Sequence, residues 1–173
     1  TRYVAVADYS SSDSDFGFLD DNGTIYNLDD DVWTSRQNSD FLAAGLLLKV
    51  SHHLSPRLRF YGQENLYWKH QGMPGISNNQ AKHARYGTFR SLSEVGIGFE
   101  GPLSLSQRLF YTHLGESFRD AHGEIGIGNQ DNRYRTRTYG WDGRVQINAD
   151  AGHLTLGAAL KREAFLPAAL LGR

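Results

Sequence analysis

The stretch that decides the fold is Thr138-Tyr-Gly-Trp-Asp-Gly-Arg-Val-Gln-Ile-Asn-Ala149. Its odd-numbered positions include Tyr139, Trp141, Val145 and Ile147, whereas its even-numbered positions hold only polar residues and a glycine. Successive side chains of a β-strand point to opposite faces of the sheet. The alternation therefore predicts a strand with one apolar face and one polar face.

The same alternation recurs on both sides of this stretch. Residues 154–161 alternate in the same way, and only Asp150-Ala-Gly152 separates the two segments, which predicts a tight hairpin. Further strands are predicted at residues 3–16, 41–54, 57–69, 86–100 and 108–118. Glu64 interrupts the apolar face of its strand, and the apolar face of residues 108–118 is ambiguous. The sequence predicts an all-β chain of about seven strands.

The connections between these strands alternate in length. The long ones are residues 19–37, 73–84 and 121–133, and the short ones are residues 52–57, 101–106 and 150–152. Long and short connections alternate in up-and-down antiparallel barrels of the outer membrane, which have short periplasmic turns and long outer loops. The predicted strands are also long enough to approach the 9–11 residues that cross a bilayer at a tilt. The pattern predicts a transmembrane β-barrel segment.

The strand count makes this barrel incomplete. Single-chain bacterial barrels close with an even number of strands, so about seven strands in 173 residues are expected to pair with strands from elsewhere. Two alternatives stay open from the pattern alone. One is a small self-contained outer-membrane barrel that acts as an adhesin or pore, and the other is a soluble lipocalin-like binding module with its apolar faces turned inward.

Composition excludes several other classes of protein. Lys and Arg (18) nearly balance Asp and Glu (19), which argues against a nucleic-acid partner. The absence of Cys excludes disulfide scaffolds and thiolate metal sites. No apolar run reaches the roughly 20 residues of a membrane-spanning helix. The mean hydropathy of -0.51 is compatible with membrane strands, because only alternate residues of such strands face lipid.

Four segments carry a resemblance to a known family. They are residues 18–33 (FLDDNGTIYNLDDDVW), 38–41 (NSDF), 71–75 (QGMPG) and 126–134 (GIGNQDNRY). In order and spacing they resemble the early barrel region of TonB-dependent outer-membrane receptors. The resemblance implies a bacterial outer-membrane protein with a barrel of about 22 strands around an N-terminal plug. It also implies import of a scarce ligand, such as a siderophore, another metal chelate or cobalamin.

The resemblance also implies a set of partners. These are outer-membrane lipid, the plug domain, the remaining barrel strands, the TonB energy-coupling complex and a small-molecule ligand. Residues 1–173 would be part of the barrel domain without the plug, and transport rather than catalysis would be the function. We therefore expect that the chain is not an enzyme.

The acidic loop is the sharpest chemical feature. It contains Asp20, Asp21, Asp29, Asp30 and Asp31. Clustered carboxylates are the ligands that calcium prefers, although the spacing of an EF-hand is absent. The alternatives are a solvated acidic loop and a surface that contacts the transported ligand. Asn-Gly-Thr within this loop matches a glycosylation sequon, but Asn-Gly is more simply a turn.

The polar strand faces supply the other site residues. The candidates for a surface facing the barrel lumen are Arg59, Lys69, Arg90, Glu94, Glu100, Asp142, Arg144 and Gln146. The candidates for an outer aromatic belt are Trp33, Trp68, Tyr67, Tyr86 and Phe118, of which Tyr67 and Tyr86 face inward in the predicted register.

Two further motifs are rejected. The segment GIGFEG at residues 96–101 matches a dinucleotide-binding fingerprint, but a strand precedes it and Pro102 follows it, so the helix that such a site needs is absent. The adjacent His52 and His53 point to opposite faces, and the other histidines have no spacing that unites them around a metal or in a catalytic group.

Overall fold

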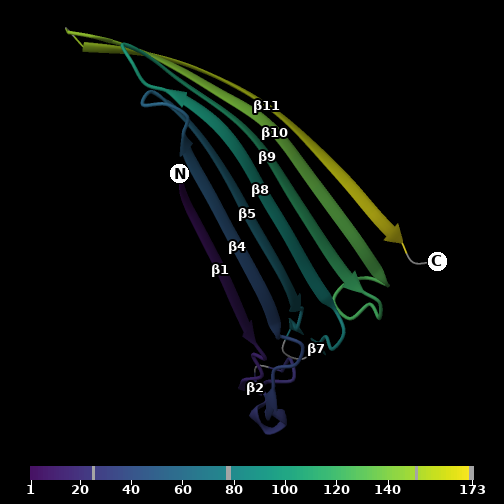
Figure 1. Cartoon of the computed structure of the whole chain (residues 1–173). Helices are drawn as coiled ribbons and strands as arrows, with labels where there is room; N and C mark the ends of the chain where they lie inside the picture. The colour runs from purple at the N-terminus through teal and green to yellow at the C-terminus, as the bar shows by residue number, and fades with distance from the viewer. Residues whose placement is uncertain (25, 77–78, 151, 172–173) are drawn as a thin grey trace.

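The computed structural model describes residues 1–24, 26–76, 79–150 and 152–171, and the chain is all-β (Figure 1). Seven long strands form one antiparallel sheet in the order β1-β4-β5-β8-β9-β10-β11. The strands are β1 (Arg2–Ser12), β4 (Phe41–His53), β5 (Leu58–Gly72), β8 (Arg85–Phe99), β9 (Leu103–Asp120), β10 (Gln130–Ala149) and β11 (Gly152–Leu171). Each long strand pairs with the next one along the chain, which confirms the predicted up-and-down arrangement.

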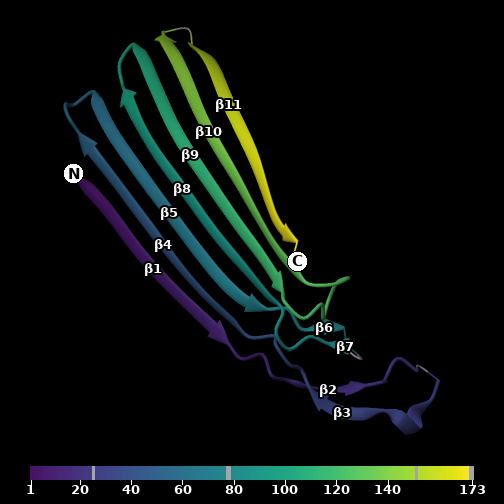
Figure 2. The same cartoon turned by 90° about the vertical axis from the view of Figure 1, so that its right-hand side faces the viewer.

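Two small hairpins extend from the long connections (Figure 2). β2 (Gly17–Asp20) pairs with β3 (Val32–Ser35), and the 3-10 helix η1 (Leu28–Asp30) lies between them. β6 (Gly75–Ile76) pairs with β7 (Asn79–Gln80). Within the described residues, no helix has the length and apolar character needed to cross a membrane.

Short and long connections gather at opposite ends of the sheet (Figure 2). The short ones are residues 54–57, 100–102 and 150–151, of which Ala151 lies outside the described residues. The long ones are residues 13–40, 73–84 and 121–129. The N-terminus lies at the short-turn end, and β11 ends at the long-connection end. The predicted alternation in loop length is therefore present.

Several strands extend beyond their predicted bounds. β9 begins at Leu103, directly after the turn at Pro102, and β10 begins at Gln130 rather than Thr138. The first eight residues of β10 are polar on both faces, so they show no alternation, yet their backbone pairs with β9 and β11. β1 is shorter than predicted and ends at Ser12.

The register assigns every strand position to one of two faces. Trp141 lies opposite Leu109 of β9 and Leu160 of β11, and we call this side the Trp141 face. Asp142 lies opposite Arg108 on the other side, which we call the Arg108 face. The ambiguity at residues 108–118 is thereby resolved, because the odd-numbered residues of β9 share the Trp141 face and the even-numbered residues share the Arg108 face.

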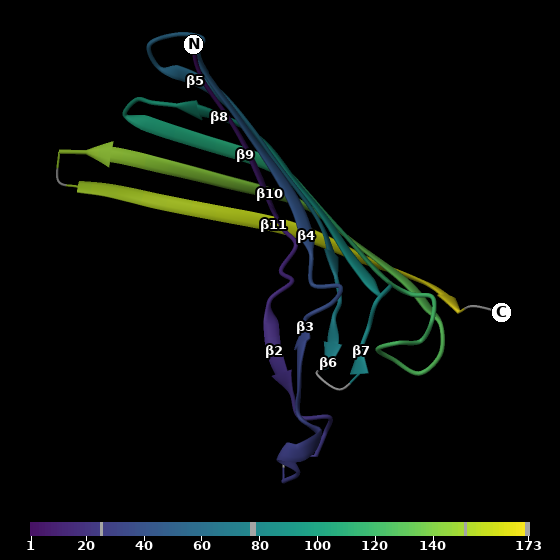
Figure 3. The same cartoon turned by 90° about the horizontal axis from the view of Figure 1, so that it is seen from below.

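The two faces differ in how much solvent they meet. On the Trp141 face, Val95 is 47% and Leu109 is 56% exposed. Among the buried strand residues, Ala43, Gly96, Asp120 and Thr138 lie on the Arg108 face, and Gly72, at the end of β5, lies on the Trp141 face. The sheet is twisted and curved (Figure 3), and a curved sheet crowds the side chains on its concave side. The exposures indicate that the polar Arg108 face is the concave one.

The sheet is not closed into a barrel. β1 and β11 are its two edges, and in the described part of the chain neither strand has a partner on its outer side. Strand edges present unpaired backbone N–H and C=O groups that favour pairing with further strands. The expectation of an incomplete barrel-like sheet is confirmed.

Candidate functional site

The Arg108 face carries the charged residues predicted to share one surface. The register places Arg59 and Lys69 of β5, Arg90 and Glu94 of β8, and Asp142, Arg144 and Gln146 of β10 on this face. Glu100 directly follows the last residue of β8, and its backbone N–H donates to the carbonyl of Arg57 at 2.8 Å, which continues the β5–β8 register by one residue pair. This register puts position 100 on the Arg108 face as well.

Arg108 connects three strands across this face. From β9, its Nε donates to Asp142 Oδ2 on β10 at 2.9 Å, and a second guanidinium N–H also reaches Asp142. Its remaining terminal nitrogen lies 3.4 Å from Glu94 Oε2 on β8. These residues line a concave space of about 530 Å³ together with Tyr61 and Arg144. Charges of both signs thus surround an open, concave surface.

Two glycines let aromatic rings lie flat on this face. The ring of Tyr61 covers Gly96 on the neighbouring strand, and the ring of Phe110 covers Gly140. A methyl group at either glycine would overlap the ring above it. The rings therefore lie against the backbone and leave the middle of the concave face open.

The Trp141 face carries a continuous band of apolar side chains. In β4 it runs from Leu42 to Val50 on alternate residues, and in β11 from Leu154 to Leu160. The members on the strands between them are Phe60, Leu66, Trp68, Phe89, Val95, Ile97, Phe99, Leu103, Leu105, Leu109, Tyr111, Tyr139, Trp141, Val145 and Ile147. We call this set the apolar band.

The apolar band crosses the strands at a slant. Leu46, at the centre of the band in β4, lies in the same hydrogen-bonded row as Ala164 of β11. The centre of the band in β11 is Gly157, so the band is displaced by 164 minus 157, or seven residues, across five strand spacings. With about 3.3 Å per residue and about 4.8 Å between strands, the slant is roughly 40°.

Glu64 is the one carboxylate inside the apolar band of β5. The hydroxyls of Ser91 and Ser93 on β8 donate to its two oxygens at 3.1 and 2.5 Å. Similarly, Trp141 Nε1 donates to Gln107 Oε1 at 2.8 Å. Glu64 and Trp141 are therefore both hydrogen-bonded to neighbours across the strands.

The predicted outer aromatic belt is only partly present. Trp68 lies on the Trp141 face opposite Phe89. Phe118 lies opposite Tyr86 on the Arg108 face, because the β8–β9 register puts even-numbered residues of β9 there. Trp33 belongs to the β2–β3 hairpin and not to the sheet. The predictions for Phe118 and Trp33 are therefore wrong.

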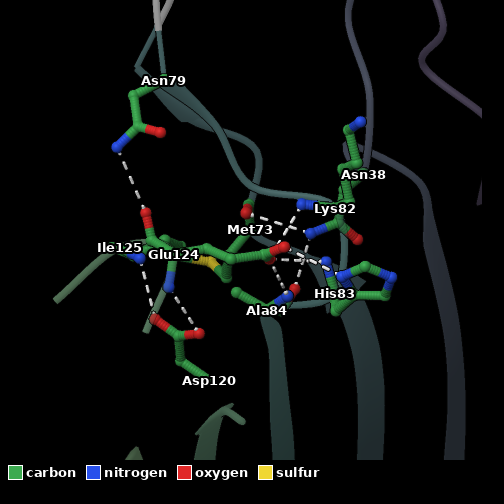
Figure 4. Close-up of polar contacts among 9 residues, drawn as sticks. All are labelled: Asn38, Met73, Asn79, Lys82, His83, Ala84, Asp120, Glu124 and Ile125. Carbon is green, nitrogen blue, oxygen red and sulfur yellow. Dashed lines mark hydrogen bonds and ion pairs between the residues drawn. The ribbon is translucent and has the colours of Figure 1, made fainter. Parts of the chain in front are cut away.

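The long connections are held together by two carboxylates (Figure 4). Glu124 accepts hydrogen bonds from the backbone N–H groups of Lys82 (2.8 Å), His83 (2.7 Å) and Ala84 (3.2 Å). Its other oxygen lies 2.8 Å from His83 Nδ1. Asp120, which is fully buried at the end of β9, accepts from the N–H of Glu124 at 2.9 Å. Residues 121–129 are thereby attached to residues 73–84.

Asn38 extends the same attachment to the first long connection. Its Nδ2 donates to the carbonyl oxygens of Met73 at 3.1 Å and Ala84 at 2.7 Å (Figure 4). Asn38 adopts a positive φ of 54°, which an asparagine tolerates better than most residues. The alternating sequence pattern gave no signal for this cluster, since its members lie in three separate loops.

The loop cluster predicts a specific response to pH. The backbone N–H of His83, its imidazole, and the N–H groups of Lys82 and Ala84 lower the pKa of Glu124 to about 2, from an ordinary value of 4.5. A depressed carboxylate pKa stabilises the fold above the ordinary value, and this stabilisation is lost as pH falls from about 4.5 through about 2. The amide shifts of residues 82–84 in an NMR titration are expected to move with a midpoint near 2.

The matched variant for this titration is Glu124→Gln. It keeps the side-chain shape and one acceptor oxygen but has no carboxylate to titrate. The amides of residues 82–84 should then show no transition between pH 2 and 5. A wild-type midpoint near 4.5 would contradict the loop attachment.

The five aspartates of the acidic loop are spread along the chain between the end of β2 and the start of β3. Asp20 ends β2, and Asp29 and Asp30 lie in η1. Thr24 Oγ1 donates to the carboxylate of Asp30, at 2.8 and 2.7 Å from its two oxygens, and Asp21 Oδ1 accepts from a backbone N–H in the same turn. Residues 22 and 23 have positive φ angles, which confirms the Asn-Gly turn.

Metal-ligating residues are not gathered in the described part of the chain. No group of three or more His, Asp or Glu side chains lies close enough there to hold an ion, so Asp20, Asp21, Asp29, Asp30 and Asp31 do not form the candidate calcium site. Two histidines do meet, because the rings of His83 and His122 lie 4.7 Å apart. Sequence reasoning missed this pair, since its members lie in different loops.

Comparison with known proteins adds no assignment, since no protein-family model, curated protein or solved structure matches this chain.

Proposed function

We propose that the chain forms part of the transmembrane barrel of an outer-membrane receptor of the TonB-dependent kind. In this proposal the Trp141 face meets lipid and the Arg108 face lines the lumen. The observation that carries it is the slant of the apolar band, because transmembrane strands are tilted by about 35–45° from the membrane normal. A band parallel to the membrane must then cross the hydrogen-bonded rows at that angle, and roughly 40° is the slant calculated from the strand spacings.

The height of the apolar band supports the same conclusion. In β4 the band extends from Leu42 to Val50, or about 26 Å along the strand at about 3.3 Å per residue. Tilted by about 40°, this segment spans about 20 Å along the membrane normal, close to the roughly 25 Å apolar band of outer-membrane barrels.

The polar face fits a hydrated interior. Barrel lumens are polar, and the ion pairs of Arg108 with Asp142 and Glu94 keep charges of both signs on the concave side. A lipocalin-like module would turn its apolar residues inward, but the apolar residues of this sheet are the more exposed ones. The exposures therefore favour the membrane barrel over the soluble alternative.

The receptor part of the proposal rests on the four segments that resemble the family and on the loop arrangement. The long connections gather at one end, where they form a capture surface for a siderophore, another metal chelate or cobalamin. The open edges β1 and β11 provide pairing surfaces for the remaining barrel strands. The plug domain and the TonB energy-coupling complex are the further partners in this proposal.

Whole-cell uptake tests the transport function. A strain in which the complete reading frame is deleted is expected to lose uptake of one ligand, which is a ferric siderophore, another metal chelate or cobalamin. Complementation with the intact gene is expected to restore this uptake only while the inner membrane is energised. Arg108→Met, which separates Asp142 from Glu94, is expected to lower uptake several-fold, whereas Arg57→Gln in a short turn leaves it unchanged. Deletion without loss of any such uptake would contradict the receptor assignment.

A further inference from the structure

An uninterrupted row of arginines lies beside the apolar band on the Trp141 face. β10 carries Arg133, Arg135 and Arg137 at alternate positions, directly beyond Tyr139 toward the long connections. Neighbouring strands add further arginines on the same face. We call the whole set the arginine patch, and its members are Arg85, Arg119, Arg133, Arg135, Arg137 and Arg162.

The arginine patch has an excess of positive charge. Arg85 pairs with Asp40 at 2.6 Å and Arg133 pairs with Asp131 at 3.3 Å, and among the described residues the other four arginines make no ion pair. Arg137 Nε is buried without a hydrogen-bond partner. Since the whole chain has a net charge of -1, this excess reflects segregation of charge onto one surface.

A groove runs between these arginines. Arg85, Arg119 and Arg133 line a space of about 540 Å³ together with His70 and Asp131, and Gly87 and Ser117 leave room in it. A second space of about 260 Å³ shares Arg133 and continues toward the apolar band. Its walls include Trp68 and Phe89. One end of the groove is therefore cationic and the other end is aromatic.

This arrangement fits an amphiphile with an anionic head. Guanidinium groups bind phosphate oxygens through paired hydrogen bonds, and each arginine near a charged lipid surface adds to the attraction. The aromatic end of the groove lies where an acyl chain would begin. We propose that the arginine patch binds the phosphate groups of a lipid headgroup in the leaflet on the long-connection side.

This inference rests on the proposed function, because it places the Trp141 face in a membrane. In an outer membrane the leaflet facing the long connections consists of phosphorylated glycolipid. The ligand of the arginine patch in this proposal is therefore the phosphorylated glucosamine headgroup of lipid A. Free phosphate and a neutral lipid are the alternatives that the experiment has to separate.

The test measures binding of fluorescent lipid A to the protein in neutral detergent micelles, with the protein produced from its complete reading frame. Arg119→Gln combined with Arg133→Gln is expected to weaken binding at least about tenfold, because both arginines line the groove. The lysine pair R119K/R133K keeps the charge and should lose less. The control pair R2Q/R57Q removes equal charge at the short-turn end and should bind like the wild type.

Probes of the wild-type protein test the inference without any variant. Lipid A stripped of its phosphates should bind at least about tenfold more weakly, and 10 mM inorganic phosphate should not displace intact lipid A. Equal binding of the stripped lipid, displacement by inorganic phosphate, or full affinity in R119Q/R133Q would each overturn the inference. If any of these results is found while Trp141 is in contact with lipid, the lipid A site is wrong and the proposed function stands. If Trp141 is instead exposed to water, the proposed function is wrong as well.

Discussion

Replacing Leu46 with arginine is expected to destabilise the protein folded in a bilayer by about 2–4 kcal/mol relative to Leu46→Ala. Leu46 lies at the centre of the apolar band in β4, where the slanted band places it near the membrane midplane. A charged side chain at that depth on the lipid face loses most of its hydration. Urea titrations of folding into phospholipid vesicles measure the difference.

Ala164→Arg is the matched variant for this measurement. Ala164 lies in the same hydrogen-bonded row as Leu46 and on the same face, but beyond the long-connection border of the band. Its paired residue on the adjacent strand β10 is Arg137, so this position already lies beside an arginine. The expected cost is about 0–1 kcal/mol, as for charges near the interface. Equal costs at the two positions would mean that the band does not slant across the membrane.

Gly72→Ala is expected to destabilise the chain by about 1–3 kcal/mol, the usual cost of overpacking. A Cβ at this position would overlap the backbone carbonyl of Asn38. The same segment is fixed by the hydrogen bond from the Gly72 N–H to the carbonyl of Asp40 at 2.8 Å. Because the obstacle is backbone, it cannot move aside without loosening the loop cluster. Urea unfolding in micelles measures the loss.

Gly98→Ala is the control for this substitution. Gly98 lies at the opposite end of the sheet in β8, and no heavy atom comes within 4 Å of the position that its Cβ would take. The stability of this variant should equal or slightly exceed that of the wild type, since alanine restricts the unfolded chain more than glycine does. A Gly72→Ala variant as stable as Gly98→Ala would contradict the close packing of residues 38–40 on β5.

The sequence predicted those parts of the sheet in which alternation is regular. Residues 139–149 and 154–160 alternate clearly, so their faces and the hairpin between them could be derived from the side-chain period of a strand. Residues 130–137 could not be assigned, because polar residues occupy both faces there, with arginines on one face and Gln130, Asn132 and Thr136 on the other. Their strand conformation depends on backbone pairing with neighbours, which the local residue pattern does not encode.

The candidate site was predictable to a similar extent. The face on which each charged side chain lies follows from its odd or even position along the strand. The contact between Arg108 and Asp142, in contrast, depends on the relative register of two strands. The slant of the apolar band likewise appears only when the six strands from β4 to β11 are aligned. The loop cluster around Glu124 joins residues more than forty positions apart, as in the contact with His83. No local pattern could indicate such contacts.

The central claim is that the Trp141 face meets lipid, and the native tryptophans test it most directly. Single-tryptophan variants retain either Trp141 in the apolar band or Trp33 in the β2–β3 hairpin, with phenylalanine at the other positions. In vesicles of lipid brominated at mid-chain, we predict strong quenching of Trp141 fluorescence and none of Trp33. Quenching of Trp141 by aqueous iodide but not by brominated lipid would contradict the account.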